Sequence, residues 1–165
     1  MVWISGRAAT VDGWFAMDVK ELLKSVESVL VIDWPAKEIP ELLALAGLRV
    51  VVHGGPGPED YSAYEARGGE AVVRRTGRPP ERADLIYSYR PLSELPAILG
   101  AAKGLQTRTM WTQSGWSAVG VKDPKGCWVP EDELELARNL VRSAGLNYIT
   151  EPYIGDVARD IVKSR

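Results

Sequence analysis

The sequence has few of the residues that metal centres and disulfide frameworks require. Its 165 residues include one cysteine, Cys127, and one histidine, His53. A single cysteine excludes an internal disulfide, and one residue of each kind is too few for a zinc finger or for a catalytic site that needs two histidines. The low cysteine count is typical of a reducing compartment, and we expect the protein to be cytoplasmic.

Long apolar runs and an excess of one charge are also missing. No apolar stretch approaches the roughly 20 residues of a membrane-spanning helix, and the first residues lack the basic start and apolar stretch of a signal peptide. The 20 Lys and Arg against 22 Asp and Glu give a net charge of −2, unlike the basic balance of many nucleic-acid binders. With 45% apolar and 25% charged residues the composition is globular. We therefore expect neither a membrane nor a nucleic acid as partner.

Apolar patterning predicts strands that alternate with helices. Runs rich in branched apolar residues indicate strands over 29–32, 48–52, 84–89, 107–112 and 146–149. Apolar residues at helical spacing indicate helices over 18–27, 39–46, 93–103, 131–144 and 156–162. The alternation predicts an α/β fold of three layers, Rossmann-like, with a doubly wound and mostly parallel sheet.

Two further features bear on the organisation of the chain. Asp18 and Glu21 predict a capping box at the start of the first helix. Residues 54–58 break the chain, after which a short helix over 59–67 and a short edge strand over 71–73 are expected. We expect an N-terminal arm over 1–17 and a single domain over 18–165.

Loops at the carboxyl ends of the strands are where an open α/β sheet binds its ligand. The first such loop lacks the Gly-x-Gly-x-x-Gly of dinucleotide folds, and it begins with Asp33 where phosphate would lie. His53 ends the second strand in place of the acidic residue that holds an NAD ribose. These departures disfavour orthodox NAD binding, and Gly54-Gly55-Pro56-Gly57 is expected to be a simple turn.

Arg90, in the Arg90-Pro91 turn before a helix, is a candidate phosphate contact, and pairing with Glu94 is the alternative. The strand end Trp111-Thr112-Gln113-Ser114-Gly115-Trp116 is either a wall that contacts a ligand, which we favour, or a turn whose Trp residues pack in the core.

Enzymatic chemistry has little support in the sequence. Ser114 lacks the flanking glycines of a Gly-x-Ser-x-Gly nucleophile elbow. Nothing in the sequence places His53 and Cys127 together as a catalytic pair. We therefore assign no catalytic and no metal-binding residue, and a binding protein is favoured over an enzyme.

Several of these segments together resemble the coenzyme A binding domain family, which is related to the nucleotide-binding part of the succinyl-CoA synthetase alpha subunit. The resemblance lies in Ala83-Asp84-Leu85-Ile86, Tyr89-Arg90-Pro91-Leu92-Ser93-Glu94-Leu95-Pro96, Trp111-Thr112-Gln113-Ser114-Gly115, and Ala144-Gly145-Leu146 with Tyr148-Ile149. The best match covers 83–149, and weaker similarity reaches back to about Asp18. This resemblance implies a Rossmann-like fold with coenzyme A as its ligand.

By position, the resemblance carries the coenzyme-binding role to four groups of residues. They are Trp34, Pro35, Ala36 and Lys37; His53 and Gly54; Arg90 and Pro91; and Gln113, Ser114 and Gly115. The chain departs from the family at Asp33, where the family has glycine, and at His53-Gly54, where it usually has Asn-Pro. It also carries an insertion over 116–129, for which three roles are open: a lid, an interface or a surface elaboration.

Two functions are therefore expected to compete. The first is binding of coenzyme A or a related adenine nucleotide, without assigned catalysis. The second is a degenerate module that has lost nucleotide binding and acts in oligomerisation or partner binding. Aromatic residues outside the inferred sheet further predict a homodimer, because Trp is enriched at interface centres; these residues are Trp3, Trp14, Phe15, Trp116 and Trp128.

Overall fold

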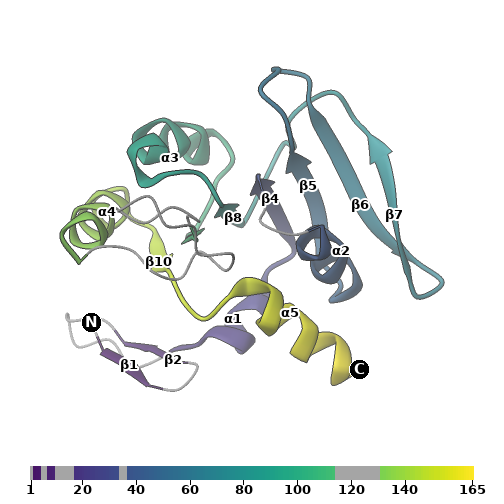
Figure 1. Ribbon diagram of the computed structural model, residues 1–165, viewed down its shortest axis with the longest axis horizontal. Helices are drawn as coiled ribbons and strands as arrows, with labels where there is room; N and C mark the ends of the chain where they lie inside the picture. The colour runs from purple at the N-terminus through teal and green to yellow at the C-terminus, as the bar shows by residue number, and fades with distance from the viewer. Residues whose placement is uncertain (1, 5–6, 10–16, 34–36, 114–130) are drawn as a thin grey trace.

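A computed structural model of the chain describes residues 2–4, 7–9, 17–33, 37–113 and 131–165, with the backbone alone for 2–4, 7–9 and 17. Its main feature is a seven-stranded sheet flanked by helices (Figure 1). The strands are β4 (Ser28–Ile32), β5 (Arg49–His53), β6 (Tyr61–Arg67), β7 (Glu70–Arg75), β8 (Leu85–Ser88), β9 (Thr109–Thr112) and β10 (Asn147–Ile149). The helices are α1 (Val19–Ser25), α2 (Glu38–Leu45), the 3-10 turn η1 (Leu92–Glu94), α3 (Leu95–Gly104), α4 (Glu131–Ser143) and α5 (Ile154–Lys163). This arrangement confirms the predicted α/β class.

Strand order determines where the chain reverses direction across the sheet. The order is β10-β9-β8-β4-β5-β6-β7, and the five strands β10 to β5 are parallel. When these five strands are numbered by their position in the chain and the sheet is read from β5 to β10, their spatial order is 2-1-3-4-5. β5 thus lies on one side of β4, and the strands β8, β9 and β10 lie on the other. The crossovers therefore switch sides between β4 and β8, which is the position where doubly wound sheets bind ligands.

Two apolar clusters cover the two faces of the sheet. On one face α1, α2 and α5 pack against β4 and β5, with Leu23, Leu43 and Ile154 fully buried. On the other face α3 and α4 pack against β8 and β9 through residues such as Leu95 and Val141. Helices on both faces explain why β8 and β9 are buried along their whole length.

Several helix ends lie where the sequence predicts them. The Asp18 carboxylate accepts the backbone N–H of Lys20 at 2.9 Å, one residue earlier than the capping box requires. Gly47 and Gly145 follow α2 and α4 with φ of 102° and 78°, which is the left-handed conformation that ends many helices.

The segment 59–67 is not a helix, and this prediction is wrong. β6 pairs antiparallel with β5 and with β7, so that β6 and β7 form a hairpin at one end of the sheet (Figure 1). Gly68 and Gly69 form its two-residue turn with φ of 60° and 83°. Two consecutive positive φ values are those of a type I′ turn, which glycine adopts without steric cost. The predicted edge strand over 71–73 is confirmed as part of β7.

Residues 76–84 connect this hairpin to β8. They carry the chain from the carboxyl edge of the sheet, where β7 ends, to the amino edge, where β8 begins, without a helix. Crossovers between parallel strands usually contain a helix. Here the connection contains Pro79 and Pro80 and, near its end, the buried Ala83.

The predicted N-terminal arm contains a second, small sheet. β1 (Val2–Ile4), β2 (Arg7–Ala9) and β3 (Met17–Asp18) pair antiparallel in that order, and β3 leads directly into α1. Among the described helices, none has the length and apolar character needed to cross a bilayer.

Candidate functional site

The carboxyl ends of the central strands lie side by side and are joined through the backbone. The N–H of Asp33, after β4, donates to the carbonyl of His53 at 3.2 Å. After β8, the N–H of Tyr89 donates to Ile32, and the N–H of Gln113, after β9, donates to Ser88. The structure therefore brings the described candidate residues at the ends of β5, β8 and β9 to one edge of the sheet, beside the end of β4.

Asp33 adopts a backbone conformation that favours glycine. Its φ is 60°, in the left-handed region where asparagine and aspartate are the best-tolerated residues other than glycine. This is the position where the coenzyme A binding domain family has glycine. The turn after β4 therefore keeps the conformation that suits glycine, and the side chain adds a carboxylate.

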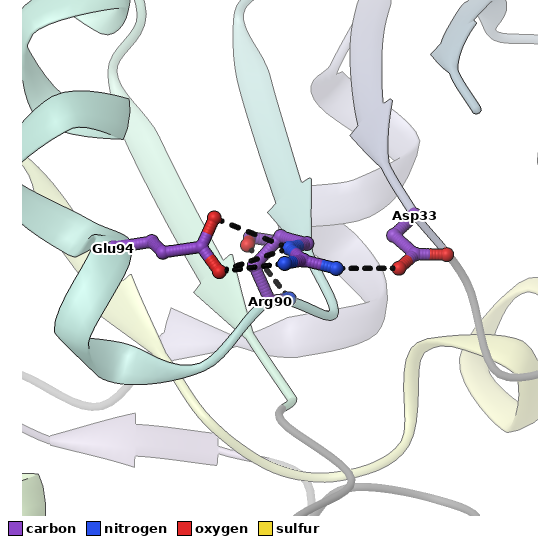
Figure 2. A network of polar contacts seen from close by, with 4 residues as sticks. Asp33, Arg90 and Glu94 are labelled. Atoms are coloured by element: carbon purple, nitrogen blue, oxygen red, sulfur yellow. Dashed lines mark hydrogen bonds and ion pairs between the residues drawn. The ribbon is translucent and has the colours of Figure 1, made fainter. Parts of the chain in front are cut away.

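Arg90 lies between two carboxylates (Figure 2). Its Nη2 donates to Glu94 Oε2 at 2.7 Å and its Nε to Glu94 Oε1 at 3.2 Å, in a bidentate pair, and its Nη1 donates to Asp33 at 3.2 Å. The hydrogen bond to Glu94 raises the pKa of Arg90 above its ordinary value, partial burial opposes this, and the bond to Asp33 adds to it. Pairing with Glu94, the alternative left open by the sequence, is therefore present.

These ion pairs remain accessible to water. The side chains of Arg90, Asp33 and Glu94 are 43%, 46% and 44% exposed. Ion pairs at such exposure typically stabilise a protein by less than about 1 kcal/mol. An anionic ligand could therefore replace one carboxylate at moderate cost, and the single contact from Asp33 is weaker than the bidentate one.

Gln113 is fully buried, and its side-chain amide is bound to the backbone. Its Nε2 donates to the carbonyls of Thr150 and Pro152 at 3.2 and 3.0 Å, and its Oε1 accepts the N–H of Ile154 at 3.1 Å. Gln113 thereby connects β9 to the start of α5. Trp111 is fully buried in the core, which favours the core alternative over a ligand wall for this residue.

His53 belongs to a tight turn that follows β5. Its ring stacks on Tyr61 with centroids 4.4 Å apart, and its Nε2 lies 3.0 Å from the carbonyl of Gly57. The Asp60 carboxylate accepts the N–H of Gly57 at 2.8 Å, and the Asp60 carbonyl accepts the N–H of Gly54. The glycine-rich segment is therefore the simple turn that we expected.

Sequence reasoning missed Asp60 and Tyr61 as partners of this turn. Both lie in the segment that was expected to be helical. A Cβ on Gly55 would come within 2.4 Å of the Asp60 carboxylate. Asp60 accepts the N–H of a residue three positions earlier, whereas in an Asx turn aspartate binds the backbone two residues further on, so the usual turn patterns did not indicate this contact.

The other candidates are placed in part. Lys37 is exposed immediately before α2, and Pro91 immediately precedes η1. Trp34, Pro35, Ala36, Ser114 and Gly115 lie outside the described residues, as does the insertion over 116–129. Within the described ranges no three His, Cys, Asp or Glu side chains gather as a metal ion would require.

The described residues also form a cavity of about 470 Å³ at the opposite, amino edge of the sheet. Its lining includes Glu27, Arg82, Asp84, Arg108 and Asn147. Burial opposes ionisation of Asp84, but the N–H of Glu27 and the Arg82 guanidinium outweigh it and hold the pKa of that carboxyl below its ordinary value. Acidic and basic side chains thus both line the cavity, and none of the predicted site residues lines it.

Comparisons with known proteins give the fold alone. No family model matches the chain, and no curated protein matches it. The chain is similar to a solved protein described as "The structure of cell-free ID.343 from Thermus thermophilus", with 21% sequence identity and a TM-score of 0.50. The similarity covers 88% of this chain and 99% of that one. At this identity it supports the α/β architecture that the strand order shows.

Proposed function

We propose that the protein binds coenzyme A, or a related adenine nucleotide, at the carboxyl ends of β4, β5, β8 and β9, with no catalysis assigned. The observation that carries the proposal is the position of Arg90 at the switch between β4 and β8. Ligands of doubly wound sheets bind at this point. The single cysteine of the chain supports the cytoplasm as the place of this binding.

The geometry suggests how Arg90 would receive a phosphate. Glu94 holds Nε and Nη2 from one side and fixes the plane of the guanidinium. Nη1 points to the other side, toward the end of β4, where it meets Asp33 (Figure 2). A phosphate oxygen that replaced the Asp33 carboxylate would gain a charge-assisted hydrogen bond while the Glu94 contact remained.

Two observations favour the competing function, a degenerate module that no longer binds nucleotides. Asp33 places a negative charge beside the expected phosphate position, and the side-chain amide of Gln113 is already bound to three backbone groups. Both functions are compatible with the fold, so ligand binding must decide between them.

Thermal unfolding of the full chain with coenzyme A, dephospho-coenzyme A, acetyl-coenzyme A, NAD and ATP provides the test. A ligand at 100 times its dissociation constant adds about 2.7 kcal/mol, which for a chain of this length raises the Tm by roughly 5–11 °C. We expect this shift with coenzyme A and a clearly smaller one with NAD. No shift and no calorimetric heat with millimolar coenzyme A would favour the degenerate module.

Substitution of Arg90 locates the site. Arg90→Ala should weaken coenzyme A binding at least tenfold, because a hydrogen bond to a charged group contributes about 1.5–3 kcal/mol. Arg90→Lys should restore part of the affinity. The matched control is Arg82→Ala, since Arg82 is likewise an arginine paired with a carboxylate, that of Asp84, but at the amino edge of the sheet. Equal effects of Arg90→Ala and Arg82→Ala on affinity would contradict the proposed position.

A further inference from the structure

The outer edge of β7 has the properties of a surface that pairs with a second copy of the same strand. β7 is the last strand of the seven-stranded sheet, and among the described strands only β6 pairs with it, along its inner edge. Val72 and Val73, at its centre, are 42% and 52% exposed. Exposed edge strands usually carry charges or proline where another chain could pair. On β7 the central positions are apolar, and the charged residues lie at the two ends.

The sequence of β7 is complementary to itself in charge. It reads Glu70-Ala71-Val72-Val73-Arg74-Arg75, with an acid at one end and bases at the other. In an antiparallel pair, directly opposite residues lie on the same face of the sheet. Two copies related by a two-fold axis through Val72 therefore place Val72 opposite Val72, and Glu70 of each copy opposite Arg74 of the other.

The backbone of β7 fits the same register. The N–H of Thr76 donates to the carbonyl of Tyr61, and this bond continues the ladder between β7 and β6. Along a strand, the backbone N–H and C=O groups of successive residues point alternately to one side and the other. The N–H and C=O groups of Glu70, Val72 and Arg74 therefore face β6, and those of Ala71 and Val73 face the open edge. The two-fold register places Ala71 of each copy opposite Val73 of the other. The backbone N–H and C=O groups that face the open edge of one strand therefore meet those of the other strand.

The charges of this edge are available for such a pair. Glu70 is exposed and forms no ion pair with any other described residue. Within the described part of the chain Arg74 has a single ion-pair partner, Glu65 of β6 at 3.8 Å, and its side chain is 66% exposed. A contact this long between exposed groups contributes little to stability. A carboxylate directly opposite Arg74 on a neighbouring strand would be a closer partner.

We propose that two copies of the chain associate through antiparallel pairing of β7 with β7, in the register centred on Val72, to form one sheet that continues through both. The interface is short. Complexes that bury less than about 1,200 Å² are generally weak, so we expect a dimer whose dissociation constant is micromolar or higher. This interface differs from the aromatic arm and insertion that the sequence suggested, most of which lie outside the described residues. The proposal does not depend on nucleotide binding.

Sedimentation velocity of the full chain without ligand, from about 5 to 500 µM, tests the association. We expect the weight-average sedimentation coefficient to rise with concentration from monomer toward dimer. Salt should weaken the dimer, because the paired charges are exposed. A monomer at every concentration would overturn the proposal.

Charge exchange tests the register. Glu70→Arg places two basic residues opposite each other at each end of the interface and should weaken association roughly tenfold, and Arg74→Glu should do the same with two acids. Neither variant should self-associate well, but an equimolar mixture should form a heterodimer, because each acid then meets a base. Glu81→Arg, on the exposed connection to β8, is a control for net charge and should leave the dimer unchanged.

The outcome of the mixing experiment is decisive in both directions. Both positions are exposed, and circular dichroism will show that the variants fold. Recovery of the dimer in the mixture, with weak association of each variant alone, supports the β7 register. A native dimer that neither variant weakens would place the interface elsewhere and overturn the proposal.

Discussion

Asp33 combines a backbone requirement with a charge, and three substitutions separate the two. Asn removes the charge and keeps the tolerance for a positive φ. Gly removes the side chain and, with it, the steric cost of the positive φ. Ala removes the charge but neither tolerates a positive φ as Asn does nor escapes its steric cost as Gly does. Each substitution removes the ion pair with Arg90, whose atoms are 3.2 Å apart, although the amide oxygen of Asn can still accept a hydrogen bond from Arg90. The series therefore measures the ion pair and the turn conformation independently.

The structure sets the expected sizes of these effects. The ion pair is nearly half exposed, so its loss in Asp33→Asn should lower the free energy of unfolding by about 0.2–1 kcal/mol. Asp33→Ala should cost about 1–2 kcal/mol, since alanine at a φ of 60° adds the left-handed penalty. Asp33→Gly should lie within about 1 kcal/mol of the native protein, because relief of that penalty offsets the lost contact and the added backbone entropy.

Ligand affinity should change in the opposite direction. Removal of one negative charge at a half-exposed position near phosphate should make the binding free energy more favourable by about 1 kcal/mol. Asp33→Asn should therefore tighten coenzyme A binding roughly fivefold. Chemical denaturation measures stability and calorimetry measures affinity for the same three variants. If Asp33→Ala were as stable as Asp33→Gly, the backbone argument would be refuted. If Asp33→Asn left affinity unchanged, Asp33 would only brace the turn, and the argument that it competes with phosphate would be wrong.

Other parts of the structure lead to three further predictions. Gln113→Ala should lower stability by about 2–4 kcal/mol in chemical denaturation, because it leaves buried backbone groups near α5 without partners; a loss below 1 kcal/mol would contradict the bracing role. Gly68→Ala should destabilise by about 1 kcal/mol and Gly100→Ala should stabilise by up to about 1 kcal/mol, since neither Cβ meets another atom and only Gly68 has a positive φ. Burial raises the pKa of Tyr148 to about 12, so the stability that its neutral form provides is complete below pH 10 and is lost as pH rises through 12; ultraviolet titration of Tyr148→Phe should lose a late-titrating signal that the native protein shows.

The buried strands could be predicted from sequence because both of their faces are covered. Val29 to Ile32 form a continuous apolar run, and β4 is indeed central, with helices on both faces. A fully buried environment selects apolar residues at every position, which is why this pattern is clear.

The hairpin could not be predicted in the same way, because much of it faces water. In β6, Glu65 and Arg67 are exposed, so alternation of apolar and polar residues is lost in the second half of the strand. A short polar segment of this kind also fits a helix. Gly68-Gly69 between two strand-like runs was the remaining indication of a hairpin turn.

At the candidate site, sequence located the strand ends but not the contacts between them. The topology brings Asp33 and Arg90 together although they are 57 positions apart in the chain. The buried bonds of Gln113 depend on how the chain enters α5, which no local pattern encodes.

The connection over 76–84 has a consequence for how the chain tolerates cleavage. From residue 78 to 82 no backbone N–H donates to a described carbonyl, and the Arg82 side chain is 53% exposed. Such a segment is open to a protease, and trypsin would cut after Arg82. The two fragments would still share one sheet, because β4 of the first pairs with β8 of the second. A nicked chain should therefore stay together in native solution and separate only when the sheet unfolds.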